Sequence, residues 1–158
     1  MTISINDTGY GIEDNSYKAA GGIEGLTKLV DTFYHYVDTL PDASIIRVMY
    51  PKDLTISKQK LAYFLSGWLG GPRLYKEHYG SISIPGIHSH MKIGTQERDA
   101  WLFCMKKAVD EQTFADSFKT YLLEQLFIRA ERIRQTCALR GSEDVSDHRP
   151  HKGGDPVI

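Results

Sequence analysis

The sequence contains no run of about 18 apolar residues, few cysteines and no marked excess of charge of either sign. No segment is therefore expected to span a membrane, and the polar first residues lack the positive start and apolar core of a signal peptide. The formal net charge of -1 gives no basic footprint for nucleic acid or for an anionic membrane surface. Cys104 and Cys137 form neither a disulfide framework nor a Cys-x-x-Cys motif. We therefore expect a reduced, cytoplasmic protein without nucleic-acid or membrane partners.

The chain also lacks strand alternation and internal repeats, and its apolar residues instead recur at three- and four-residue intervals. With 158 residues and 41% apolar side chains, it is long enough for one packed all-α domain. The expected long helices run from Ile23 to about Leu40, from Thr55 to a Gly70-Gly71-Pro72 stop, from a cap at Thr95 past Ala108, and from about Thr113 to Thr136. We predict that residues 1–19 form an extension with a short helix, 20–137 the domain, and 138–158 a disordered polar tail.

The connection between the second and third helices is too long for a plain helical bundle, at roughly 25 residues. It contains Gly80, Pro85 and Gly86, which interrupt helices. It also carries His88 and His90 on an apolar background. Taken alone, such histidines are more often satisfied core or surface residues than metal ligands. A segment that wraps around a flat ligand would explain the length of the connection.

Several short motifs occur in the order and at the spacing of one known family. They are Gly21-Gly22, Leu29-Val-Asp-Thr-Phe-Tyr34, Tyr50-Pro51-Lys-Asp53-Leu54, Phe64-Leu65, Leu69-Gly-Gly-Pro72-x-x-Tyr75 and Ile93-Gly94-x-x-Glu97-Arg98-Asp99-Ala100-Trp101-Leu102-x-Cys104-Met105. Over about residues 20–135 the chain resembles the group II truncated haemoglobins, which have a two-over-two helical globin fold. The resemblance implies a helical sandwich around haem b, iron protoporphyrin IX.

The resemblance assigns His88 as the proximal iron ligand, because the family's histidine lies five residues before the isoleucine that is Ile93 here. A neutral imidazole binds iron through Nε2, while its Nδ1–H is oriented by a carbonyl or a water molecule. The resemblance gives no role to His90, which we interpret as a solvated loop residue. The remaining histidines, His35, His78, His148 and His151, are interpreted in the same way.

Tyr34, Tyr50 and Trp101 match the family's distal positions, which implies that their O–H and N–H groups donate to a diatomic ligand on the iron. Core packing, with the polar tip tied elsewhere, is the alternative. Ser57 and Leu61 match the gate positions, where Ser57 leaves a small door and Leu61 offers no hydrogen bond. A net hydrogen bond in a dry site contributes about 1–2 kcal/mol, so two or three donors are expected to slow O₂ release about a hundredfold or more.

An apolar wall around the haem is also implied, made of Phe64, Leu65, Leu69, Ile84, Met91 and Ile93. Pro85 and Ile87 stand where the family usually has arginines, so pairing of the haem propionates is left to Lys60, with Arg73 and Lys92 as weaker candidates. An exposed charge pair contributes less than about 1 kcal/mol. The haem is therefore expected to be retained mainly by its histidine ligand and the apolar wall.

The leading hypothesis is a haem protein that reversibly binds O₂, CO, NO or related small ligands, for oxygen binding or transport. The alternative at the same iron is enzymatic: oxidation of nitric oxide to nitrate by bound O₂, or peroxidase-like detoxification, with an external reductase as electron donor. A gas or redox sensor ranks third, because the sequence offers a polar tail and no recognisable output domain. A monomer or weak dimer is expected.

Overall fold

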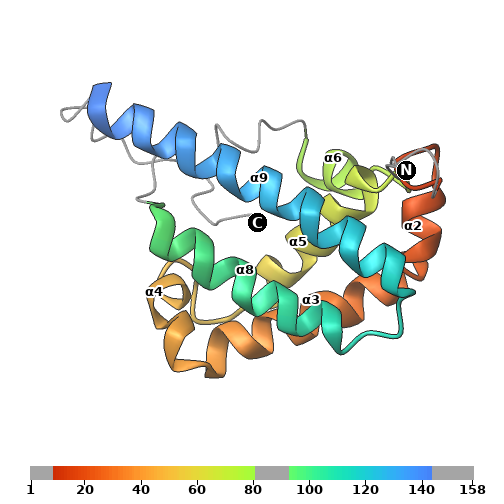
Figure 1. Cartoon of the computed structure of the whole chain (residues 1–158), viewed down its shortest axis with the longest axis horizontal. Helices are drawn as coiled ribbons and strands as arrows, with labels where there is room; N and C mark the ends of the chain where they lie inside the picture. Colours follow the sequence, from red (N-terminus) through yellow and green to blue (C-terminus); the bar gives the residue numbers. More distant parts are fainter. Residues whose placement is uncertain (1–8, 81–92, 144–158) are drawn as a thin grey trace, which may run out of the picture.

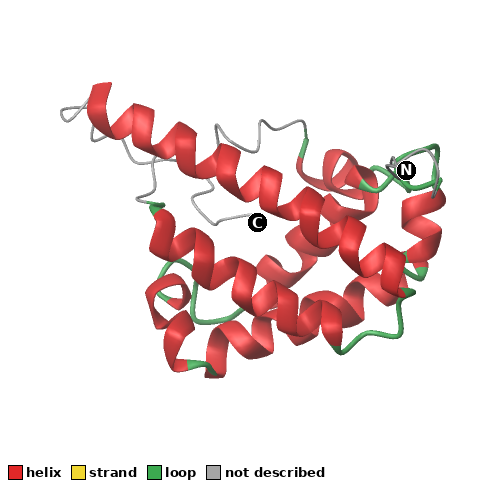
Figure 2. Cartoon of the chain, in the orientation of Figure 1, coloured by secondary structure: helices red, strands yellow, loops and turns green. Residues whose placement is uncertain are grey.

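The computed structural model describes residues 9–80 and 93–143, and their side chains as far as Ala138 (Figure 1). In this part of the chain helices are the only regular secondary structure, as Figure 2 shows, which confirms the all-α prediction. None of these helices is long and apolar enough to cross a membrane. In chain order they are α2 (Asn15–Ala19), α3 (Gly22–Thr39), the 3₁₀ turn η1 (Pro41–Ala43), α4 (Ser44–Arg47), α5 (Thr55–Trp68), α6 (Leu74–Tyr79), α8 (Thr95–Asp110) and α9 (Asp116–Glu143).

The four long helices predicted from the sequence are present as α3, α5, α8 and α9, and they pack as a two-over-two sandwich (Figure 1). Helix α3 contacts both α5 and α8, and α8 in turn contacts α9. Their apolar stripes meet in one core, which includes Leu26, Leu29, Phe33, Leu61, Leu65, Met105, Ala108, Phe118, Leu122 and Leu126. A fully buried side chain of the Leu or Phe kind contributes about 1.5–3 kcal/mol, and this burial holds the two helix pairs together.

The start of α8 differs in detail from the prediction. Thr95 is the first residue of the helix, and Gly94 occupies the N-cap position with φ -98° and ψ -166°. The Gly94 N–H donates to the Glu97 carboxylate at 2.8 Å, so the first-turn glutamate closes the helix end instead of a threonine hydroxyl. A carboxylate in this position also interacts favourably with the helix dipole.

Two further helices differ from what the sequence predicts. Helix α9 begins at Asp116 and continues to Glu143, whereas the predicted helix ends at about Thr136. The extra turns contain Ala138, Leu139 and Arg140, which are strong helix formers, so polar composition alone was a poor guide to the helix end. The short helix α6 was not predicted at all, because six residues are too few to show a periodic apolar pattern.

Tyr17 of α2 explains both double-glycine motifs in the sequence. Its backbone N–H donates to the Leu69 carbonyl at 3.1 Å, and its hydroxyl accepts from the Ile23 N–H at 3.1 Å. A Cβ atom on Gly71 would lie 2.4 Å from the Tyr17 ring, closer than any real side chain allows. Gly22, with φ +67°, packs against the same ring. The segment before α3 therefore fixes the end of α5, which is one wall of the site described next.

Candidate functional site

Three aromatic side chains with polar tips meet in the core, each from a different element. Tyr34 comes from α3, Tyr50 from the turn after α4, and Trp101 from α8. They are 0%, 7% and 6% exposed. The rings of Tyr34 and Tyr50 pack edge to face with centroids 5.2 Å apart, and Phe33 lies 5.0 Å from Tyr34 and 5.1 Å from Trp101. The structure thus brings the three predicted distal residues together.

The hydroxyl groups of Tyr34 and Tyr50 lie close to other polar groups of the protein. The Tyr34 hydroxyl donates to the Ser57 carbonyl at 3.5 Å, which is at the long limit for a hydrogen bond. Burial raises the pKa of the Tyr50 hydroxyl far above its ordinary value, and the neighbouring Tyr34 hydroxyl and Trp101 indole offset part of that effect. Tyr50 is therefore a neutral phenol at every physiological pH, able to donate a proton in a hydrogen bond.

Two polar atoms at this site are buried without a hydrogen-bond partner among the described residues, namely Trp101 Nε1 and Ser57 Oγ. The indole N–H lies close enough to the Tyr50 hydroxyl to affect its pKa, but it does not meet the geometry of a hydrogen bond. Leaving a buried donor unpaired costs about 1–3 kcal/mol, and such groups are rare in folded proteins. A small polar ligand bound at this place would accept hydrogen bonds from these unpaired donors.

Apolar side chains surround the cluster on the α5 side. Leu61 and Leu65 are fully buried and Leu69 is nearly so. Phe64 is partly buried and stacks on Trp68 with centroids 5.9 Å apart. Ser57, at the predicted gate position, is also fully buried.

A pocket opens beside Tyr50 and Trp101, with a volume of about 430 Å³ including the part open to solvent. The two aromatics share its lining with Ile46, Met49, Ile93, Glu97, Arg98, Ala130 and Ile133. Of the predicted wall, Ile93 is in this lining. Sequence reasoning missed Ile46 and Met49, although the short apolar run before Tyr50 was a signal for them, and it missed the contribution of α9.

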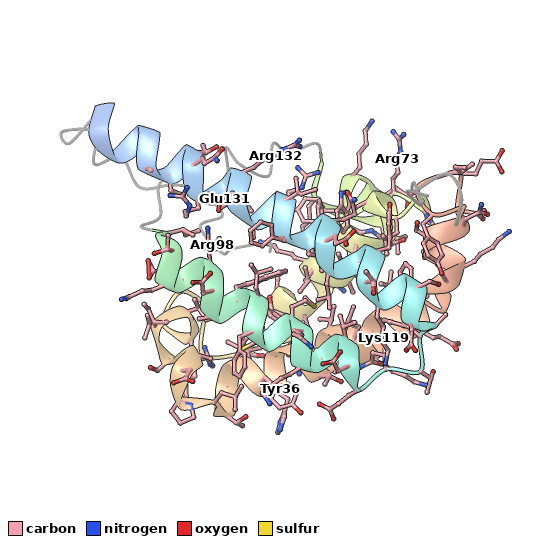
Figure 3. All side chains as sticks on the ribbon, viewed as in Figure 1. Tyr36, Arg73, Arg98, Lys119, Glu131 and Arg132 are labelled. Carbon is pink, nitrogen blue, oxygen red and sulfur yellow. The ribbon has the colours of Figure 1, made fainter. Side chains whose placement is uncertain are left out.

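The polar rim of the pocket joins α8 to α9. Arg98 pairs with Glu131 of α9 and with its neighbour Asp99, and Arg134 pairs with the same Glu131 (Figure 3 labels Arg98 and Glu131). By contrast, the Lys60 ammonium lies 5.5 Å from the centre of the Tyr79 ring. Lys60 forms no ion pair within residues 9–80 and 93–138.

The predicted residues on the other side of the haem, His88, Ile84 and Met91, lie outside the described residues, as do Pro85, Ile87, His90 and Lys92. The site as described is therefore its distal half and the adjoining pocket.

The bacterial-like globin family matches residues 15–134 of this sequence. The chain belongs to this family. It is 36% identical over 125 residues to the group 2 truncated hemoglobin YjbI of Bacillus subtilis (strain 168), a match that covers 78% of this chain and 92% of that protein. The truncated haemoglobin is similar in structure to the group II 2-on-2 hemoglobin of Agrobacterium tumefaciens, with a TM-score of 0.72 and 34% identity over 75% of this chain and 92% of the other.

It is also similar to the truncated oxygen-avid haemoglobin of Bacillus subtilis, with a TM-score of 0.69 and 36% identity over 75% of this chain and 97% of the other. These matches confirm the group II truncated haemoglobin prediction and its two-over-two fold. The protein is a haem-binding, oxygen-binding globin. The apolar walls and the unpaired donors Trp101 Nε1 and Ser57 Oγ fit that cofactor and a small ligand beside it.

Proposed function

We propose that this truncated haemoglobin binds haem through His88 and holds O₂, CO or NO on the iron by hydrogen bonds from Tyr34, Tyr50 and Trp101. The observation that carries the proposal is the buried Trp101 N–H, which has no acceptor among the described residues. When bound, haem supplies an iron atom with a coordination position for a diatomic ligand. All other contributions come from side chains of this chain.

Each distal side chain contributes to ligand binding in a different way. Tyr50 is kept neutral by burial, so its hydroxyl remains a donor. The Tyr34 hydroxyl makes a hydrogen bond to the Ser57 carbonyl at 3.5 Å, which is long and weak, so we expect this hydroxyl to turn toward a ligand on the iron. Trp101 offers its N–H without breaking an existing hydrogen bond. Ser57 Oγ, also unpaired, is a fourth donor in addition to its role at the gate.

The apolar side chains exclude water and leave the polar tips as the ligand's main partners. Leu61, Phe64 and Leu65 do this from α5, and Leu69 does so from the position after the helix. We assign Ile84, Met91 and Ile93 to the remaining wall. Donors in a dry site are worth more than in water, at about 1–2 kcal/mol each. Two or three of them slow O₂ release about a hundredfold. The relative from Bacillus subtilis is described as oxygen-avid, and we expect tight retention of O₂ here, which suits transport poorly.

A second function at the same site is oxidation of nitric oxide to nitrate, or peroxidase-like detoxification. The convergence of several donors in a dry pocket favours it, because such a pocket keeps O₂ in place until a second reactant arrives. An external reductase would restore the ferrous state. In a stopped-flow experiment, rapid loss of the oxygenated spectrum on mixing with nitric oxide is expected, and an unchanged spectrum would reject this function.

The proposal also covers the location, oligomeric state and extent of the folded unit. We propose a cytoplasmic monomer or weak dimer, with a role as gas or redox sensor as the least supported alternative. The packed unit is proposed to extend beyond residues 20–137, because Tyr17 packs on the end of α5 and α9 reaches Glu143.

A haem titration tests the proposal directly. The purified chain, supplied with ferric haem, is expected to take up one equivalent and to develop a Soret band. His88→Ala should abolish the band or shift it strongly. His90→Ala is the matched control, two positions away, and should behave as wild type. Equal spectra for the wild type and His88→Ala would overturn the assignment of His88.

A further inference from the structure

Two arginines on α9 carry charges that no carboxylate balances in the described part of the chain. Arg129 and Arg132 are one helical turn apart, and neither guanidinium takes part in an ion pair or a hydrogen bond there. Arg47, Arg98 and Arg134 each have a carboxylate partner. Arg129 is partly buried, and burial followed by repulsion from Arg132 lowers the pKa of its guanidinium. A charge that is partly removed from water without a counterion is destabilising, and an anion beside Arg129 would offset that cost.

The two arginines lie next to the pocket beside Tyr50 and Trp101. Their neighbours on α9, Ala130 and Ile133, line that pocket. The Arg129 guanidinium lies 5.9 Å from the centre of the Trp68 ring, and Trp68 stacks on Phe64 of the predicted haem wall. Figure 3 shows Arg132 projecting from α9 on the same side of the molecule as Arg73. The segment 129–133 thus presents apolar residues to the pocket and arginines beside it.

The sequence limits which carboxylates could pair with Arg129 and Arg132. Segment 81–92, which lies between α6 and Ile93, contains no aspartate or glutamate, so its side chains offer no carboxylate. Elsewhere, the carboxylates whose side chains lie outside the described ones are Asp7, Glu143, Asp144, Asp147 and Asp155. The other source of carboxylates is haem itself, which carries two propionates on one edge of the ring. Arginine binds carboxylates with two parallel hydrogen bonds, a geometry that lysine cannot offer.

We propose that Arg129 and Arg132 form a carboxylate-binding site at the edge of the pocket and that the haem propionates occupy it. The proposal rests on haem binding at the site described above. It makes α9 a binding element for haem in addition to a core helix.

Haem transfer to an excess of an apoglobin acceptor, followed by Soret absorbance, tests the proposal in the full chain. Arg129→Gln is expected to lose haem about fivefold faster than wild type, the exposed Arg132→Gln about threefold, and the double variant about 15-fold. Lys119→Gln is the matched control, because it removes the same charge from α9 about 15 Å further along the axis at 1.5 Å per residue. It should lose haem at the wild-type rate. Equal rates for wild type and the double variant would overturn the proposal.

Repeating the experiment with haem dimethyl ester distinguishes propionates from other carboxylates. The ester has no ionised propionate, so wild type and the double variant should then lose it at the same rate within about twofold. A difference that persists with the ester would overturn the proposal, because the arginines would then act on the protein itself. The full-chain variant Asp7→Asn/Glu143→Gln/Asp144→Asn/Asp147→Asn/Asp155→Asn should leave the effect of the arginine substitutions unchanged. Disappearance of the effect would assign the arginines to the chain's own carboxylates and overturn the proposal. A chain that stays colourless in all forms would instead contradict haem binding at His88.

Discussion

Tyr34 and Tyr50 meet edge to face, with ring centroids 5.2 Å apart and an interplanar angle of 87°. One comes from the middle of a long helix and the other from a turn sixteen positions later, so the pair exists only because α3 and the turn after α4 fold together. The contact keeps both hydroxyls within the same buried space, next to Trp101. An edge-to-face pair contributes about 0.5–1.5 kcal/mol beyond its buried area, which helps to hold the two donors in place.

Replacing Trp101 by phenylalanine is expected to speed O₂ dissociation about tenfold, because one donor worth roughly 1.4 kcal/mol is lost from a dry site. The indole N–H has no partner within the described residues, so the haem-free protein should lose no hydrogen bond. Its free energy of unfolding should fall only by the amount that a smaller buried side chain costs. Laser photolysis or stopped-flow mixing with dithionite measures the rate. Phe103→Leu, at an exposed position on α8, is the control. An unchanged dissociation rate in Trp101→Phe would mean that the indole N–H does not reach the ligand.

Ser57→Ala distinguishes the two roles of Ser57 at the gate. If its hydroxyl donates to the ligand, O₂ dissociation should rise about threefold, while O₂ association should change little because both side chains are small. The Ser57 Oγ atom is buried and unpaired, so its removal should leave the free energy of unfolding of the haem-free protein unchanged or slightly higher. The same kinetic experiments, with urea unfolding, measure both effects. Faster O₂ association with unchanged O₂ dissociation would show that Ser57 controls ligand entry and does not donate a hydrogen bond to the ligand.

The distal half of the site was predictable from the sequence because family spacing fixes positions that periodicity cannot. Tyr34 lies on the buried face of α3, which periodicity also predicts, but Tyr50 lies in a turn with no periodic signal at all. Thr95 and the end of α9 were mispredicted because a first-turn glutamate competes with threonine as a cap, and because helix propensity outweighed polar composition. Arg129 could not be singled out in advance, because its significance lies in the absence of a carboxylate partner among the described residues, and a sequence does not show which side chains pair.

Gly71→Ala should destabilise the protein by about 2–3 kcal/mol, because its Cβ would overlap the Tyr17 ring at 2.4 Å. The ring is also anchored by hydrogen bonds through the Tyr17 backbone and hydroxyl, so it cannot move aside freely. Urea unfolding measures the change. Gly67→Ala is the control, since its Cβ would meet only ordinary contacts near 3.4 Å and alanine favours the helix by roughly 0.5–1 kcal/mol. Equal stability of the Gly71→Ala variant and the wild type would show that Tyr17 does not pack as described.

The ion pairs between α8 and α9 should make stability depend on pH in the acid range. The Arg134 guanidinium, with a further contribution from Arg98, holds the pKa of the Glu131 carboxylate below its ordinary value of 4.5. Because the pKa is lower in the folded state than in the unfolded state, the stabilisation is fully present above about pH 4.5 and is lost as the pH falls through the folded value. The difference in unfolding free energy between wild type and Glu131→Gln, measured in urea at a series of pH values, should therefore shrink from pH 5 downward. The control is Glu124→Gln, which removes an exposed carboxylate from the same helix and should show no such trend. A difference for Glu131→Gln that stays constant with pH would mean that the pairs with Arg98 and Arg134 do not form in solution.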